Sequence, residues 1–210
     1  MMSFEDAAKA CGIVAILRGV TPDEVAGLGD ALHDAGIRVV EVPLNSPDPF
    51  RSIAALAARF QSRMVVGAGT VLDVDSVDRV KSAGGQISVS PDCNPRVIAH
   101  AAERGLVPLP GVFTPTEAFA AVRAGARHLK LFPAEAANPT TVKAWKAVLP
   151  RDVNIYAVGG VTPANMKDWA DAGCAGFGIG SNIYKPGMSA DDVGKAARDF
   201  VAAWTKLRGN

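Results

Sequence analysis

The stretch NIYAVGGVTPANMKDWADAGCAGFGIGS, residues 154–181, shows the pattern that recurs along the whole chain. Two short apolar runs, NIYAVGG (154–160) and GFGIGS (176–181), flank a longer segment that opens on a Thr-Pro pair and closes on Gly173. Threonine can cap free helical N–H groups, proline fits the first helical turn, and glycine permits the left-handed conformation that stops a helix. The stretch therefore predicts a strand, a crossover helix and a second strand.

The same alternation continues from end to end and predicts eight strands. Most of the short runs are rich in Val, Ile and Leu, as expected for strands that are buried on both faces. They are IVAILR (13–18), VVEVPL (39–44), MVVGAGT (64–70), QISVS (86–90), LVPLPG (106–111), HLKLFP (128–133), NIYAVGG and GFGIGS.

Eight strands with helical crossovers indicate an α/β fold, a (β/α)8 TIM barrel that residues 1–210 form as a single domain. Residues 3–12 predict a short N-terminal helix that closes the bottom of the barrel. Thr21-Pro22 and Thr114-Pro115 predict two further helix starts, each with a glutamate that completes a capping box. A doubly wound open sheet is the alternative, but the first strand–helix turn, LRGVTPDE, lacks the GxGxxG fingerprint.

Composition narrows the function classes. The net charge is +1, which gives no reason to expect a nucleic-acid partner, and no apolar run reaches the length of a membrane span. The acidic N-terminus does not resemble a signal peptide. Three cysteines without a CxxC pair and three scattered histidines predict neither disulfides nor a metal site. We therefore expect a cytoplasmic protein with reduced thiols and no cofactor.

Three charged residues stand inside the apolar runs: Arg18 ends the first, Glu41 lies within the second and Lys130 within the sixth. Strand side chains alternate, so the leucines beside Lys130 face the helices while Lys130 points into the barrel, and Glu41 does the same. A single lysine in a strand is often an edge residue that extends its amine to water. Three such charges near the C-terminal rim, where barrel enzymes carry out their chemistry, indicate an active site.

A lysine removed from water beside a second cation has a lowered pKa. Its neutral amine can attack a ketone to form a Schiff base, and the protonated imine accepts electrons from a neighbouring C–C or C–H bond. Glu41 could transfer the protons that this chemistry requires.

The ends of the last two runs predict a phosphate site, because barrels often bind phosphate after strands seven and eight. Glycines there allow backbone N–H groups to approach an anion, although glycines also serve simply to make tight turns. Thr70 is a further hydroxyl donor at the rim. The candidate substrate-binding residues are Arg18, Thr70, Pro91, Phe132, Val158, Gly159, Gly160, Gly180 and Ser181.

Taken together, these motifs resemble the class I aldolases that act on 2-keto-3-deoxy-6-phospho sugar acids. The resemblance rests on AILRG (15–19), VEVPLNSP (40–47), GAGTVL (67–72), LKLFPA (129–134), AVGGVTP (157–163) and GIGS (178–181), and covers nearly the whole chain. It implies a homotrimeric barrel of carbohydrate metabolism that releases pyruvate and D-glyceraldehyde 3-phosphate. Lys130 would be the Schiff-base lysine and Glu41 the acid/base group, acting through a water. Arg18 would hold either the carboxylate or the phosphate.

Two departures bear on the substrate. Gluconate-type members of the family have a pattern similar to E-[VI]-T-L-R, whereas this chain has Asn45 in place of the arginine. They also have a threonine before the Gly-Gly pair, where this chain has Val158. Both features resemble the galactonate-type members, which implies a role in galactonate degradation and 2-dehydro-3-deoxy-6-phosphogalactonate as the substrate. Its gluconate epimer, a dual specificity, and a non-catalytic phosphosugar-binding barrel are the alternatives.

Overall fold

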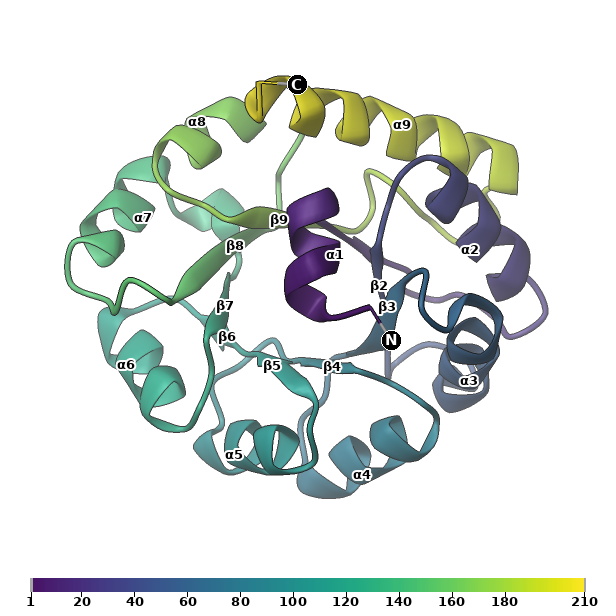
Figure 1. The fold of residues 1–210 in the computed structure, drawn as a ribbon, viewed down its shortest axis with the longest axis horizontal. Coiled ribbons are helices and arrows are strands. Elements are labelled where there is room, and N and C mark those ends of the chain that lie inside the picture. Colours follow the sequence, from purple (N-terminus) through teal and green to yellow (C-terminus); the bar gives the residue numbers. More distant parts are fainter. Residues whose placement is uncertain (1, 210) are drawn as a thin grey trace.

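The computed structural model describes residues 2–209 and shows a ring of strands surrounded by helices (Figure 1). The strands are β1 (Ile13–Ile16), β2 (Val39–Pro43), β3 (Val65–Gly69), β4 (Ile87–Val89), β5 (Val107–Leu109), β6 (Gly111–Val112), β7 (His128–Leu131), β8 (Asn154–Val158) and β9 (Gly176–Ile179). They form one sheet in the order β5-β4-β3-β2-β1-β9-β8-β7-β6, and every pairing is parallel.

The two ends of this strand order meet in the chain, because only Pro110 separates β5 from β6. β5 pairs with β4 and β6 pairs with β7, while the Pro110 carbonyl accepts a hydrogen bond from the Lys130 backbone N–H at 2.9 Å. Proline has no N–H to donate, so it divides this strand into two short pieces. The run LVPLPG thus occupies one strand position, and the sheet closes into a nearly complete eight-position barrel. The barrel prediction is confirmed and the open sheet is wrong.

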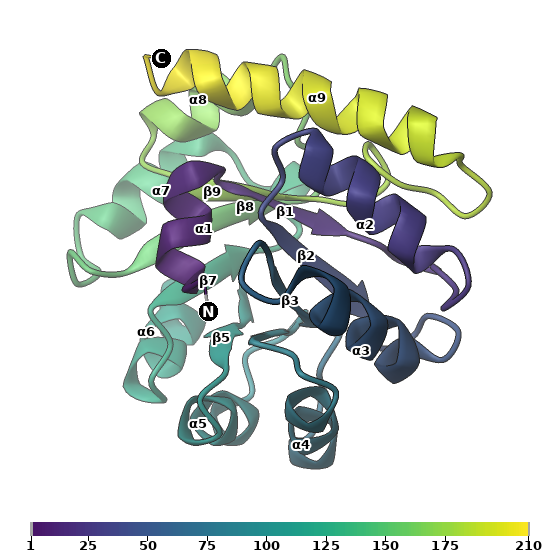
Figure 2. The same ribbon diagram turned by 45° about the vertical axis from the view of Figure 1, so that its right-hand side comes forward.

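The helices form the outer ring, which Figure 2 shows from a second direction. They are α1 (Phe4–Ala10), α2 (Val25–Asp34), α3 (Pro49–Phe60), α4 (Val74–Ser82), α5 (Pro95–Glu103), α6 (Pro115–Arg123), α7 (Pro139–Lys146), α8 (Met166–Asp171) and α9 (Ala190–Leu207), with a 3-10 turn, η1, at Ala134–Ala136. Within residues 2–209, no helix combines the length and the apolar character needed to cross a bilayer.

The predicted helix starts are correct in one case and early in two. Thr114 caps α6, and Glu117 completes the capping box. The other two Thr-Pro pairs begin a turn instead, and the regular helices α2 and α8 start only at Val25 and Met166. At α2, the Glu24 carboxylate still accepts a hydrogen bond from the backbone N–H of Thr21, so the local capping contact forms ahead of the helix.

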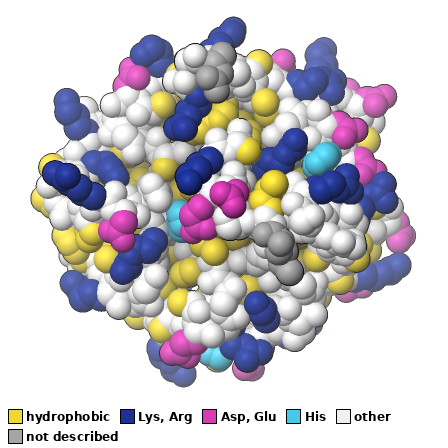
Figure 3. All heavy atoms as spheres, viewed as in Figure 1, with side chains coloured by type: hydrophobic (Ala, Val, Ile, Leu, Met, Phe, Trp, Pro, Cys, Tyr) yellow, Lys and Arg dark blue, Asp and Glu magenta, His cyan; other side chains and the backbone are white. Residues whose placement is uncertain are grey.

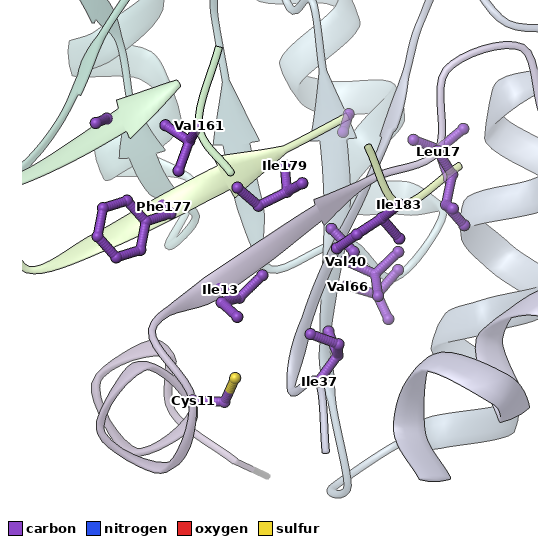
Figure 4. Packing of buried hydrophobic residues seen from close by; sticks show 14 of the residues in the cluster. Cys11, Ile13, Leu17, Ile37, Val40, Val66, Val161, Phe177, Ile179 and Ile183 are labelled. Atoms are coloured by element: carbon purple, nitrogen blue, oxygen red, sulfur yellow. The ribbon is translucent and has the colours of Figure 1, made fainter. Parts of the chain in front are cut away.

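Alternation along the strands divides the apolar side chains into two layers, as the sequence predicts. The outer layer lies between strands and helices and includes Val40, Val66 and Phe177 (Figure 4). The inner layer fills the barrel and includes Val39, Val65 and Tyr156 together with Phe4 from α1. Because neighbouring residues face opposite sides, Glu41 and Lys130 belong to the inner face. The burial of both layers is the main source of stability.

Helix α1 closes the N-terminal end of the barrel, as expected from residues 3–12. In Figure 1 it lies across the centre of the ring, and its Phe4 ring packs edge-on against His128 with centroids 4.7 Å apart. Around this end, Lys and Arg side chains spread over the rim with Asp and Glu among them, in keeping with the small net charge (Figure 3).

We expect acid to destabilise the protein through His128. Burial lowers its pKa below the ordinary 6.5, although Glu5, 3.6 Å away, favours the charged form. The folded state thus binds this proton less readily than the unfolded chain, so the stabilisation is complete above about pH 6.5 and falls as the pH drops toward the lower folded pKa. His128→Leu should remove this pH-dependent contribution to stability. Between about pH 8 and pH 5, the melting temperature of the wild type should fall by a few degrees more than that of the variant. An equal fall in the two melting temperatures would contradict this role of His128.

Candidate active site

A cavity of about 520 Å³ opens at the C-terminal ends of β1, β7, β8 and β9. Barrel enzymes build their sites at this end, because the strand–helix loops there can vary without disturbing the core. The residues that line it are Ile16, Arg18, Lys130, Phe132, Glu135, Val158, Gly159, Gly160, Val161, Gly178, Ile179, Gly180, Ser181, Asn182, Tyr184, Lys185 and Pro186.

Lys130 lines this cavity, and it shares a second, small apolar space inside the barrel with Glu41. The exposed fractions of Lys130 and Glu41 are only 6% and 2%. The Lys130 Nζ lies 4.5 Å from the centroid of the Phe132 ring, whose face favours a nearby cation. Within residues 2–209, the Oε2 of Glu41 has no hydrogen-bond partner. A buried acceptor of this kind is available to a substrate hydroxyl or to a bridging water.

Burial moves the pKa of each group toward its neutral form. Desolvation raises the pKa of Glu41 to about 7, although the charges of Lys130 and Arg18 oppose the shift. Desolvation also lowers the pKa of Lys130, an effect that Glu41 opposes and Arg18 reinforces. A carboxyl group that titrates near neutral pH can both take and return a proton, and a less basic amine is more often free to attack a carbonyl.

Gly69 gives the Glu41 carboxyl group its space. This glycine is the last residue of β3 and faces the barrel interior, where an added Cβ would overlap the Oε1 and Oε2 of Glu41. Any side chain at this position would therefore displace the carboxyl group. The GAGT motif marks a point of close approach that glycine alone satisfies.

The turn after β1 is tied to the turn after β2. The Arg18 Nη1 donates a hydrogen bond to the Oδ1 of Asn45 at 2.7 Å, and the Gly19 N–H donates to the Oγ of Ser46 at 2.9 Å. Arg18 itself lies two residues beyond β1 rather than at the end of the strand as predicted, and it is exposed at the cavity mouth. The positive charge of Arg18 opposes the raised pKa of Glu41 and reinforces the lowered pKa of Lys130.

The glycine-rich end lies where the sequence predicts. Gly159 and Gly160 have φ values of +106° and +65°, a conformation that disfavours any other residue, and they line the cavity with Gly180 and Ser181. The carboxylate of Glu135, on η1, lies against both glycines. Sequence reasoning missed Glu135, because the three-residue η1 is too short to show a periodic pattern.

The remaining predicted site residues divide into two groups. Phe132 and Val158 line the cavity, whereas Thr70 and Pro91, which follow β3 and β4, do not. Thr70 has φ +58°, a strained conformation for a β-branched residue and one that often occurs at functional sites. Nine lining residues were not predicted. Ile16, Gly178 and Ile179 lie at the ends of strands and Glu135 lies on η1, whereas the others follow strands: Val161, Asn182, Tyr184, Lys185 and Pro186. The described residues contain no cluster of three or more His, Cys, Asp or Glu side chains suited to a metal.

Comparison with known proteins agrees with this geometry. Residues 4–198 match the family model described as KDPG and KHG aldolase. The chain is 49% identical to the probable 2-dehydro-3-deoxy-6-phosphogalactonate aldolase of Rhizobium meliloti (strain 1021), over 94% of this chain and 93% of that protein. It is 46% identical to the 2-dehydro-3-deoxy-6-phosphogalactonate aldolase of Escherichia coli (strain K12), over 91% and 94%.

Gluconate-type relatives are less similar. The 2-dehydro-3-deoxy-phosphogluconate aldolase of Pseudomonas aeruginosa is 31% identical over 76% of this chain and 73% of that protein. Among solved structures, one described as native KDPGal has a TM-score of 0.92 at 45% identity, covering 94% of this chain and 96% of that chain. The chain belongs to the KDPG and KHG aldolase family.

Proposed function

We propose that the protein cleaves 2-dehydro-3-deoxy-6-phosphogalactonate to pyruvate and D-glyceraldehyde 3-phosphate, with Lys130 as the Schiff-base residue and Glu41 as the acid and base. The observation that carries the proposal is that Lys130, which lines the cavity, is buried and shares a small apolar space with the buried Glu41. It stands in a chain with 49% and 46% identity to two galactonate-type aldolases.

The chemistry follows from the burial of this pair. The Lys130 amine attacks the C2 ketone, and loss of water forms a protonated imine. Glu41, directly or through a water, accepts the proton of the C4 hydroxyl, and the C3–C4 bonding electrons move into the imine to form an enamine. The aldehyde leaves, Glu41 returns the proton to C3, and hydrolysis of the new imine releases pyruvate and the free amine.

Cleavage should depend on pH through Glu41. The carboxylate must be ionised to accept a proton, and burial raises its pKa to about 7. We therefore expect kcat/KM to rise about tenfold per pH unit below an apparent pKa near 7 and to level off above it. Glu41→Gln should lose most activity and also lose this acidic limb. A wild-type profile that stays flat down to about pH 5 would contradict the role of Glu41.

The substrate assignment is tested with the two C4 epimers side by side. We expect pyruvate release from the galactonate substrate to exceed that from the gluconate epimer by at least about tenfold in kcat/KM, because a change of polar groups near C4 alters transition-state binding. Asn45 and Val158 support this preference as the positions where the chain resembles the galactonate type. Equal rates would indicate dual specificity. Cleavage of neither epimer, with no borohydride-trapped pyruvate adduct, would indicate a non-catalytic phosphosugar-binding barrel.

We also propose that three copies associate, as the family resemblance implies. A chain 45% identical over 94% of this one forms part of a cage designed by fusing symmetric oligomeric domains. Leu72 and Phe113, which follow β3 and β6, are large apolar residues with exposed fractions of 49% and 41%, and such side chains often pack against a partner. Light scattering should give a mass of three chains of 21.7 kDa; a monomer mass would refute it.

A further inference from the structure

The turn that follows β3 has a strained backbone. Thr70 has φ +58°, in the left-handed region that a β-branched residue seldom adopts. Such a conformation persists only where the surrounding structure holds it. Thr70 directly follows Gly69, the glycine against which the Glu41 carboxyl group packs. The strained residue therefore lies one position from the wall of the proposed acid and base.

Both neighbours of Thr70 are fixed by backbone hydrogen bonds. Before it, the Gly69 carbonyl accepts a hydrogen bond from the Leu44 N–H at 2.8 Å, which joins the turn to the end of β2. After it, the Val71 N–H donates to the Val89 carbonyl at 3.1 Å, which joins the turn to β4. The turn is thus held between the strands on either side of β3.

The Ser90 side chain adds a third bond to this turn. Its Oγ donates to the Val71 carbonyl at 2.8 Å, and the serine is only 5% exposed. The Ser90 N–H donates to the Leu109 carbonyl at 3.2 Å, which fixes the serine itself against β5. A buried carbonyl that loses its partner is unfavourable. Loss of the Ser90 hydroxyl would therefore favour a rotation of the backbone at residues 70–71.

The packing of β3 leaves little room for such a rotation. An added Cβ at Gly67 would overlap the Ile87 carbonyl of β4, and one at Gly69 would overlap the Glu41 carboxyl group. The strand is therefore in close contact with β4 on one side and with Glu41 on the other. A rotation at Thr70 would move Gly69 away from the carboxyl group and admit water to it.

We propose that Ser90 is a positioning residue for Glu41. Its hydroxyl holds Thr70 in the left-handed conformation, and this turn keeps Gly69 against the Glu41 carboxyl group. Ser90 is not among the described residues that line the cavity or the small apolar space, so it acts through the backbone. The proposal rests on the proposed function, in which Glu41 is the acid and base.

The experiment uses Ser90→Ala and, as a milder change, Ser90→Cys, whose thiol is a weaker donor. Ser52→Ala is the matched control, because Ser52 is a fully buried serine of α3 whose Oγ has no hydrogen-bond partner within residues 2–209. The readouts are kcat, the apparent pKa of the acidic limb of kcat/KM, and borohydride trapping of pyruvate. Melting temperatures measure the structural effect separately.

We expect Ser90→Ala to lower kcat about tenfold and to move the acidic limb down by about one pH unit. Desolvation raises the pKa of Glu41 and the charges of Lys130 and Arg18 oppose the shift, so entry of water moves this pKa toward its ordinary 4.5. Ser90→Cys should shift the limb less in the same direction, and Ser52→Ala should not shift it. Trapping of pyruvate should stay within about twofold of wild type, because Lys130 is unchanged.

A second comparison tests the route through Thr70. Glycine adopts the left-handed conformation without strain, so in a Thr70→Gly background the added Ser90→Ala should move the limb by less than about 0.3 pH unit. A full shift in that background would overturn the proposal. So would Ser90 variants that melt at lower temperature but keep the wild-type kcat and limb, since these would show a structural role alone. If the wild type neither cleaves the substrate nor traps pyruvate, the proposed function itself has failed, which the variants cannot imitate.

Discussion

Lys130→Met is expected to reduce kcat/KM by at least about 10⁴-fold, because removal of the proposed covalent nucleophile leaves only substrate binding and orientation. Methionine keeps an unbranched apolar side chain in the buried position and removes the amine. The variant should also fail to gain the mass of a reduced pyruvate adduct after borohydride treatment. Pyruvate release and mass spectrometry of the intact chain measure the two effects.

The fold should survive this substitution. The exposed fraction of Lys130 is 6%, so replacing its amine by an apolar group removes a desolvation cost. Glu41, whose pKa is already raised, can remain buried in its protonated form. Lys143→Met is the control, because Lys143 is exposed on α7 and does not line the cavity. A Lys130→Met variant that still formed the adduct would show that another amine is the nucleophile.

Gly69→Ala should inactivate the enzyme almost as completely as Glu41→Ala, by about 10²–10⁴-fold in kcat, the range typical of general acid–base catalysis. The added methyl group would occupy the space of the Glu41 carboxyl group and push it away from the reacting carbons. Because Gly69 does not line the cavity and its added Cβ would meet Glu41, we expect its role to be the positioning of that carboxyl group. The variant should therefore still trap pyruvate with borohydride, since Lys130 is unchanged.

Two further variants separate this effect from a general loss of stability. Gly69→Ala combined with Glu41→Ala removes the overlap, so it should recover much of the lost melting temperature while remaining inactive. Gly27→Ala is the matched control: Gly27 lies in α2, an added Cβ would contact nothing within 4 Å, and alanine favours a helix. Full activity in Gly69→Ala would refute the positioning role, as would equal melting temperatures of Gly69→Ala and the double variant.

The sequence predicts the barrel and the position of the buried pair because both depend on local alternation. Glu41 and Lys130 interrupt apolar runs, and the parity of their neighbours determines which face they occupy. The division of one strand at Pro110 was not predicted, because it depends on which partner each piece meets. The starts of α2 and α8 were predicted too early, since a Thr-Pro pair can begin a turn as readily as a helix.

The loop residues of the site could not be predicted from the pattern. Glu135 and Lys185 lie outside the strands and α-helices, where no periodicity predicts which way a side chain points. Both line a cavity that is built largely from segments distant from them in the chain. The need for glycine at position 69 could not be predicted either. The sequence shows the glycine, but only the folded barrel shows that the Glu41 carboxyl group occupies the place of a Gly69 Cβ. The bond between Arg18 and Asn45 joins two loops that are 27 residues apart.

The helix that closes the N-terminal end, α1, has a consequence for the order in which the products leave. With Phe4 packed into the base of the barrel, the mouth is the route by which molecules enter and depart. In the proposed mechanism pyruvate stays attached to Lys130 after the aldehyde has formed, so we expect the aldehyde to leave first and pyruvate second. Steady-state kinetics should therefore follow an ordered scheme, in which pyruvate inhibits competitively with substrate and D-glyceraldehyde 3-phosphate inhibits non-competitively.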